Sequence, residues 1–183
     1  LGAPLAAAES KRIAWSREAV GPAGIGWFGA LSVAHSAKWV MGATGVVALA
    51  LLWRREFAAA GWLAAVVPGG ALLNALLKHV FERARPSLDA LAPRIGDFAF
   101  PSGHAANATL FYGAIVVLVA CRTGSGGIRA TVAGLAVAMV LAVAASRVVL
   151  GAHYPTDVVA GIAEALAWLV LCTLAMGGER AVC

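Results

Sequence analysis

Residues 102–120 read SGHAANATLFYGAIVVLVA and contain no side chain that is fully charged at neutral pH. A helix needs about 20 mainly apolar residues to cross the roughly 30 Å hydrocarbon core of a bilayer. Three other runs, at 57–77, 130–146 and 158–176, have a similar length and composition. Across the chain 61% of residues are hydrophobic and 13% are charged, whereas about a quarter of the residues in a soluble domain are charged. The sequence therefore predicts an all-α, polytopic membrane helix bundle.

The N-terminal part of the chain is harder to divide into spans. Residues 19–53 form an apolar run interrupted only by Lys38, which is too long for one span and too short for two spans with a turn. We interpret 39–53, with a few preceding residues, as a fifth span and the earlier part as an interfacial or re-entrant segment. Residues 1–8 are apolar and are interpreted as the remnant of a first span.

These assignments predict one membrane-embedded domain over residues 1–183. Within it, 1–36 are expected to form an interfacial or truncated N-terminal helix region. Residues 37–183 are expected to form the catalytic helix bundle, with five clear spans.

The distribution of charge indicates which kinds of partner the chain could bind. The formal net charge is +5, but the basic residues are scattered between apolar runs rather than gathered in one patch. Such a pattern fits anionic headgroups or phosphate better than nucleic acid. The three cysteines show neither Cys-x-x-Cys nor Cys/His spacing, so no zinc site is expected.

Three polar clusters interrupt the apolar sequence. They read KHVFERARP at 78–86, PSGH at 101–104 and SRVVLGAHYPTD at 146–157. In the span assignment Lys78 ends one helix and His104 begins the next, while Arg147 ends the following helix and Asp157 begins the last. Because successive spans alternate in direction, all three clusters are expected on the same face of the membrane.

The residue types in these clusters suit phosphoryl transfer, which depends mainly on positioning and on cations that stabilise the phosphoryl oxygens. Lys78, Arg85 and Arg147 supply three positive charges, and the arginines can bind oxygens bidentately. The backbone N–H groups of Ser102, Gly103 and His104 lie where a helix is expected to start, which is a natural anion site.

Two histidines can divide the covalent chemistry. A neutral imidazole attacks phosphorus through one nitrogen while the other donates to a carboxylate. Asp157 follows His153 by four residues, so the two share a face if the helix begins at His153. His104 is then available to protonate the leaving oxygen.

Together these three motifs resemble the signature of the type 2 phosphatidic acid phosphatase family, whose site is shared with vanadium haloperoxidases and bacterial acid phosphatases. The resemblance covers Lys78 to Asp157 and implies a six-helix membrane fold. It implies that His153 is the nucleophile, that Asp157 orients it and that His104 is the acid and later the base. The phosphate-binding residues implied are Lys78, Arg85, Ser102, Gly103 and Arg147. Neither a metal nor a cofactor is implied.

The predicted function is hydrolysis of a lipid phosphomonoester or diphosphate through a phosphohistidine. Plausible substrates are a polyprenyl diphosphate such as undecaprenyl diphosphate, phosphatidate and a phosphatidylglycerol phosphate. The alternatives are a lipid phosphotransferase with an acceptor other than water, and a non-catalytic transporter or binding subunit. A soluble haloperoxidase is disfavoured by the composition.

Three further expectations concern the surroundings of the site. Residues 87–100 are expected to contact the headgroup. Glu164 follows Asp157 by seven residues and shares its helix face, which leaves open a hydrogen bond inside the bundle or a role near the site. The resemblance implies a bacterial inner membrane protein whose site faces the periplasm or the outside, although the distribution of Lys and Arg does not decide the orientation.

Overall fold

The computed structural model describes residues 3–86 and 98–176, and all regular structure within these ranges is helical. The helices are α1 (Ala3–Ala34), α2 (Ala37–Trp53), α3 (Phe57–Phe81), α4 (Gly103–Arg122), α5 (Gly126–Val149) and α6 (Pro155–Ala175). α3 to α6 are each long and apolar enough to cross a membrane. α1 and α2 meet at a 47° bend and are long and apolar enough only as a pair, which has the geometry of a broken span or a re-entrant segment. The expected all-α membrane bundle is confirmed, and the protein is an integral membrane protein.

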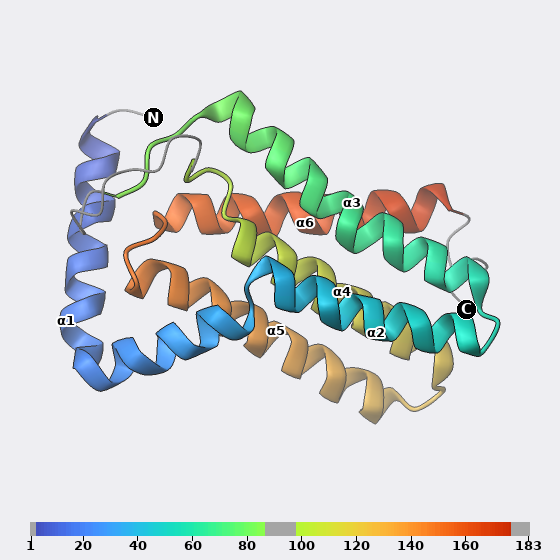
Figure 1. Ribbon diagram of the computed structural model, residues 1–183. Coiled ribbons are helices and arrows are strands. Elements are labelled where there is room, and N and C mark those ends of the chain that lie inside the picture. The colour runs from blue at the N-terminus through green and yellow to red at the C-terminus, as the bar shows by residue number, and fades with distance from the viewer. Residues whose placement is uncertain (1–2, 87–97, 177–183) are drawn as a thin grey trace.

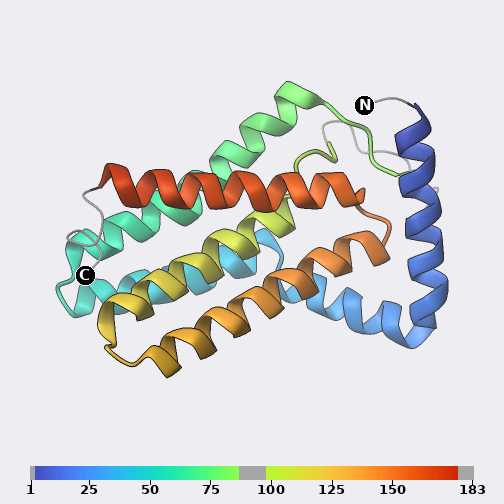
Figure 2. The same cartoon turned by 180° about the vertical axis from the view of Figure 1, so that it is seen from behind.

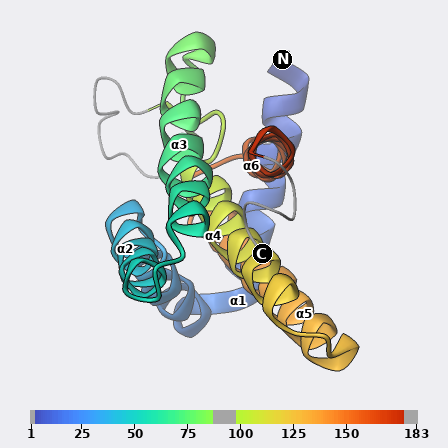
Figure 3. The same cartoon turned by 90° about the vertical axis from the view of Figure 1, so that its right-hand side faces the viewer.

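α4 lies in the centre of the bundle, with α2, α3, α5 and α6 around it (Figure 3). The main apolar core lies where α3, α4 and α6 meet, and Trp62, Val66 and Leu110 are fully buried there. Large apolar side chains on the outer faces, such as Leu141 of α5 and Leu171 of α6, remain exposed to the surroundings. In lipid this arrangement costs little, because apolar side chains are compatible with both the core and the acyl chains.

α1 changes direction at Gly21, which has φ 62° and ψ −177°. This conformation is essentially restricted to glycine. The part of α1 before the break crosses one end of the bundle, and the part after it runs toward α2 (Figures 1 and 2). Arg17 fastens the crossing part by donating to the backbone oxygen of Leu150, at 3.0 Å, just after α5.

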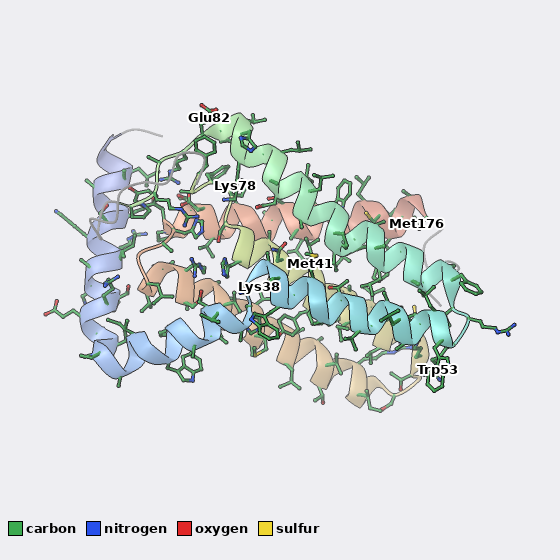
Figure 4. All side chains as sticks on the ribbon, in the orientation of Figure 1. Lys38, Met41, Trp53, Lys78, Glu82 and Met176 are labelled. Carbon is green, nitrogen blue, oxygen red and sulfur yellow. The ribbon has the colours of Figure 1, made fainter. Side chains whose placement is uncertain are left out.

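The opposite end of the bundle carries the turns between α2 and α3 and between α4 and α5 (Figure 1). Trp53 and Met176 also lie at this end (Figure 4). An ion pair between Arg122 and Glu56 joins the two turns. The two turns therefore lie at the same end of the bundle, opposite the one that α1 crosses.

α6 packs unusually closely on the start of α4. The backbone N–H of Ser102 donates to the backbone oxygen of Asp157, at 2.9 Å. One helical turn further along α6, a Cβ added to Gly161 would lie 2.6 Å from the backbone oxygen of Ser102. Glycine at this position therefore lets the starts of α4 and α6 approach within backbone contact.

Gly161→Ala is expected to destabilise the protein by about 1–3 kcal/mol, because the added methyl overpacks a backbone contact that has no flexible side chain to yield. Gly134→Ala on α5, where an added Cβ meets nothing within 4 Å, is the matched control. Thermal unfolding of both variants in detergent, monitored by size-exclusion chromatography, measures the difference. Equal stability of the two variants would contradict the proposed close packing.

Candidate active site

The four helix ends that carry the polar clusters meet at one end of the bundle. These are the C-terminal ends of α3 and α5 and the N-terminal ends of α4 and α6 (Figure 1). Lys78 lies toward this end of α3 (Figure 4). The expectation that the three clusters share one face is therefore confirmed, although α3 continues to Phe81 rather than ending at Lys78.

His153 lies in the short connection between α5 and α6 and is only 2% exposed. Its backbone N–H donates to the backbone oxygen of Arg147, at 3.2 Å. Its ring Nδ1 lies 2.7 Å from the backbone oxygen of Ala99. A carbonyl oxygen only accepts hydrogen bonds, so Nδ1 must carry a proton. In the neutral ring the lone pair is then on Nε2.

Arg85 supports the same tautomer. Its Nη1 lies 3.4 Å from Nε2 of His153 and donates to the backbone oxygen of Ala152, at 2.9 Å. A guanidinium only donates, so the Nε2 facing it is the unprotonated nitrogen. The Nε2 lone pair of His153 therefore faces the positive charge of Arg85.

Asp157 is fully buried, and its Oδ2 lies 3.7 Å from Nδ1 of His153. This separation permits electrostatic attraction but exceeds a hydrogen bond. The same Oδ2 accepts the backbone N–H of Tyr154, at 2.9 Å, and so caps the start of α6. The condition for a shared helix face, a helix that begins at His153, is not met. α6 begins at Pro155, whose ring suits the first position of a helix, so His153 precedes it.

The other two expected cations also reach this region. Arg147 is largely buried in the last turn of α5, and its Nη1 donates to Oγ of Ser32 in α1. Lys78 donates from Nζ to the backbone oxygen of Phe98, at 2.7 Å. Both side chains are close enough to His153 to act on it electrostatically.

His104, in the first turn of α4, interacts electrostatically with His153, Arg85 and Arg147. Ser102 immediately precedes this helix, and its Oγ is buried without a hydrogen-bond partner among the described residues. One detail of the expected anion site was wrong. The N–H of Ser102 is occupied by the backbone oxygen of Asp157, so Ser102 can reach a phosphate only through its hydroxyl.

Gly103 lies beside α3 at the start of α4. A Cβ at this position would be 3.2 Å from Oδ1 of Asn74 and 3.8 Å from Cε of Lys78. The structure thus brings Gly103 next to the lysine expected to bind the same phosphate.

The electrostatic surroundings of His153 favour its neutral form. Burial, which penalises the charged ring, lowers its pKa from 6.5 to about 4, and the positive charges of Arg85, Arg147 and Lys78 act in the same direction. The carboxylate of Asp157 opposes this shift. At neutral pH the ring is therefore unprotonated at Nε2.

Sequence reasoning missed two charged residues at the site. Arg83 forms an ion pair with Asp157, with 2.5 Å between Nη1 and Oδ1, and Glu9 of α1 binds the same guanidinium. Arg83 precedes Arg85 by two residues in the segment without regular structure that follows α3. That spacing was an available signal. No local pattern marked Glu9, because its role depends on where α1 lies.

Two expectations about the surroundings have different outcomes. Nδ2 of Asn74 donates to Oε2 of Glu164, at 2.9 Å, which links α3 to α6 inside the bundle. Lys78 also acts electrostatically on Glu164, so a role near the site stays open. The loop expected to contact the headgroup spans 87–100. Residues 87–97 of this loop lie outside the described residues.

Within residues 3–86 and 98–176, no three His, Cys, Asp or Glu side chains are grouped as metal ligands would be. A mechanism without a cofactor remains a prediction.

Comparison with known proteins decides the family. The sequence profile of the PAP2 superfamily matches residues 59–180, which include all three polar clusters. The chain belongs to the PAP2 superfamily. Its solved relatives include a transmembrane PAP2 type phosphatidylglycerolphosphate phosphatase from Bacillus subtilis, with a TM-score of 0.84 over 95% of this chain and 87% of that one. At 22% identity this likeness shows a shared fold.

Curated relatives in the superfamily carry phosphatase names. The chain is 37% identical to decaprenylphosphoryl-5-phosphoribose phosphatase of Mycolicibacterium smegmatis over 69% of this chain and 64% of the relative. It is 39% identical to lipid A 1-phosphatase of Rhizobium johnstonii over 59% of this chain and 43% of that relative. For phosphatidylglycerophosphatase B of Bacillus subtilis the identity is 38% over 52% and 47%. This PAP2 protein thus spans less than two thirds of these relatives' own length.

The pKa of His153 in this PAP2 protein is expected to lie near 4 in the absence of bound phosphate. Between pH 4 and 6.5 the unfolded chain protonates this imidazole and the folded chain does not. Its contribution to stability therefore falls as the pH falls through that window. NMR of histidine-labelled protein in detergent, with His153→Ala to assign the signal, measures the midpoint. A midpoint at or above 6.5 would contradict the described burial of the ring.

Proposed function

We propose that this protein is an integral membrane phosphatase that releases phosphate from a lipid-linked phosphate through a phosphohistidine at His153. One observation carries the proposal most directly. The hydrogen bond to Ala99 leaves the lone pair of His153 on Nε2, and Arg85 lies 3.4 Å from that atom. This contact supports the proposal, because it puts the proposed nucleophile beside a cation that can bind phosphate oxygens.

In the first half of the proposed reaction, Nε2 of His153 forms a bond to phosphorus as the bond to the leaving oxygen breaks. The imidazole gains positive charge in this step, and the carboxylate of Asp157, 3.7 Å from Nδ1, stabilises it. His104 gives its proton to the leaving oxygen, which departs as the alcohol of the lipid or as a lipid phosphate.

In the second half, water attacks the phosphohistidine. His104 accepts a proton from the water, the P–N bond breaks, and inorganic phosphate leaves with His153 neutral again. Lys78, Arg85 and Arg147 hold the non-bridging oxygens in both halves, where their charge matters most in the transition state. The hydroxyl of Ser102 has no partner among the described residues, which supports a contact with the same oxygens.

For the substrate we propose a polyprenyl-linked phosphate or diphosphate first, with phosphatidylglycerol phosphate and phosphatidate as further candidates. Two features support a lipid. The site lies at one end of a bundle of apolar spans, where a substrate tail stays in the bilayer while its headgroup reaches the cations. In addition, the curated relatives are named for lipid-linked phosphates, including a decaprenylphosphoryl compound.

We further propose that the protein resides in a bacterial inner membrane with the site facing the periplasm or the outside. Residues 1–36 would form the N-terminal helix region and 37–183 the catalytic bundle. The break between α1 and α2, at His35 and Ser36, supports a boundary there.

His153→Ala is expected to lower phosphate release by at least ~10⁴-fold, since a methyl group cannot attack phosphorus. His79→Ala is the matched control, because His79 is exposed and outside the expected site. Initial rates are measured with a panel of purified lipids dispersed in detergent: undecaprenyl diphosphate, a polyprenylphosphoryl phosphosugar, phosphatidylglycerol phosphate and phosphatidate. A chelator is included in every assay.

Each outcome of this assay separates the alternatives. Phosphate release that survives His153→Ala would refute the phosphohistidine. Transfer of labelled phosphoryl to an added alcohol in preference to water would replace the phosphatase with a phosphotransferase. Binding of every lipid without turnover by the natural sequence would favour a non-catalytic binding protein.

Vanadate is expected to inhibit competitively at well below millimolar concentration. It adopts the five-coordinate geometry of the transition state, and transition-state analogues bind at least about 100-fold tighter than substrates. Sulfate, which stays tetrahedral, is the control anion and should inhibit much more weakly. Equal inhibition by the two anions, or none by either, would count against a phosphoryl-transfer site.

A further inference from the structure

Arg83 occupies a central position behind the candidate site. Its Nη1 donates to Oδ1 of Asp157, at 2.5 Å, and to Oγ1 of Thr156, at 2.7 Å. Its Nη2 lies 3.0 Å from Oε2 of Glu9. The guanidinium carbon lies 4.3 Å from the ring centre of Tyr154, in cation–π geometry. Arg83 therefore contacts three residues at the start of α6, which are Tyr154, Thr156 and Asp157, together with Glu9 of α1.

Glu9 holds this arrangement from the other side. Its side chain is 2% exposed, and its Oε1 accepts the backbone N–H of Thr156, at 2.9 Å. That N–H belongs to the first turn of α6 and has no partner within the helix. Glu9 thus caps the helix with one oxygen and binds Arg83 with the other.

Simple stabilisation is a weak explanation for this buried ion network. Removing charges from water costs about as much as their attraction returns, so apolar packing often stabilises a protein as well as a buried ion pair does. What the network does fix is geometry. Oδ1 of Asp157 is taken by Arg83, so Oδ2 is turned toward Tyr154 and His153.

We propose that Arg83, itself held by Glu9, is a positioning residue that fixes the carboxylate of Asp157 and through it the imidazole of His153. The proposal deepens the proposed function and rests on it. It also makes the N-terminal helix α1 part of the catalytic apparatus, through a residue that lies outside the PAP2 match at 59–180.

The charges around His153 give the proposal a distinctive signature. The groups that act on the ring are Asp157, Arg85, Arg147, Lys78 and His104, and Arg83 and Glu9 lie behind Asp157. Loss of the positive Arg83 leaves Asp157 to pull harder on Nδ1–H and raises the pKa of His153. Loss of the negative Glu9 acts in the opposite direction. A general loosening of the structure would instead move the pKa of His153 toward its ordinary value in both the Arg83 and the Glu9 variant.

The first experiment compares Arg83→Gln and Arg83→Lys with Arg12→Gln, a control on the exposed side of α1. Arg83→Gln is expected to lower kcat about 100-fold, the usual effect of a misplaced reacting group, with KM changed by less than about threefold. Lysine keeps the charge but cannot bridge two carboxylates with a planar fork, so Arg83→Lys should recover only part of kcat. Arg12→Gln should match the natural sequence.

The second experiment compares Glu9→Gln with Glu18→Gln, whose exposed carboxylate lies on the same helix. Glu9→Gln should lower kcat while leaving the NMR midpoint of His153 unchanged or lower, whereas Arg83→Gln should raise that midpoint. In the double variant, the loss of kcat, expressed as a free energy, should be smaller than the sum of the losses in the two single variants, because both residues act on one carboxylate.

Two results would overturn the proposal. One is a kcat within about twofold of the natural sequence in Arg83→Gln. The other is a shift of the His153 midpoint in the same direction in both Arg83→Gln and Glu9→Gln, which would indicate a structural role. The NMR titration needs no turnover, so a natural protein that released no phosphate would refute the proposed function while leaving the positioning role testable.

Discussion

The hydrogen bond from Nδ1 of His153 to the backbone oxygen of Ala99 determines what the rest of the site can do. It fixes which ring nitrogen carries the proton, and so which one faces Arg85. Ala99 lies just after the described part of the chain resumes, and its own N–H donates to the backbone oxygen of Arg83, at 2.7 Å. A segment far from His153 in sequence therefore fixes the tautomer of its ring through a main-chain oxygen.

The bilayer restricts where charged side chains can lie in this protein. A bilayer offers no water to an ionised side chain, so charged residues gather at helix ends or pair inside the bundle. Lys78, Arg147 and Asp157 all lie within the first or last turns of their helices. Alternating helix direction then brings every second connection to the same side. The grouping of the candidate site follows from these two constraints together.

Most of the fold and the core of the site could be predicted from the sequence for this reason. Uncharged runs of about the right length marked the spans, and three spaced motifs marked the residues that now lie together. The ends of the helices were harder to predict from the sequence: α3 continues to Phe81, and α6 starts only at Pro155. Those limits depend on local capping, such as the contact of Asp157 with the N–H of Tyr154.

The contributions of α1 could not be predicted, because they depend on tertiary placement. Nothing near Glu9 in the sequence indicates a partner at Arg83, and nothing near Ser32 indicates Arg147. The turn at Gly21 redirects the chain at the end of the bundle. In the sequence, this glycine indicates only that an apolar run is poorly suited to one continuous helix. Arg83 was easier to suspect, since it lies only two residues before Arg85 within the first polar cluster.

The central position of α4 divides the helices into two kinds. In its most apolar stretch α4 has 44% of its residues buried within the protein, against 39% for α3 and 28% for α5 and for α6. Polar side chains are accommodated on it, with Asn107 and Thr109 both buried. The outer faces of α5 and α6 contact mainly lipid, so many apolar residues are interchangeable there. Substitutions in α4 meet neighbouring helices more often, so exchanges between apolar residues are expected to be tolerated better on the outer faces of α5 and α6.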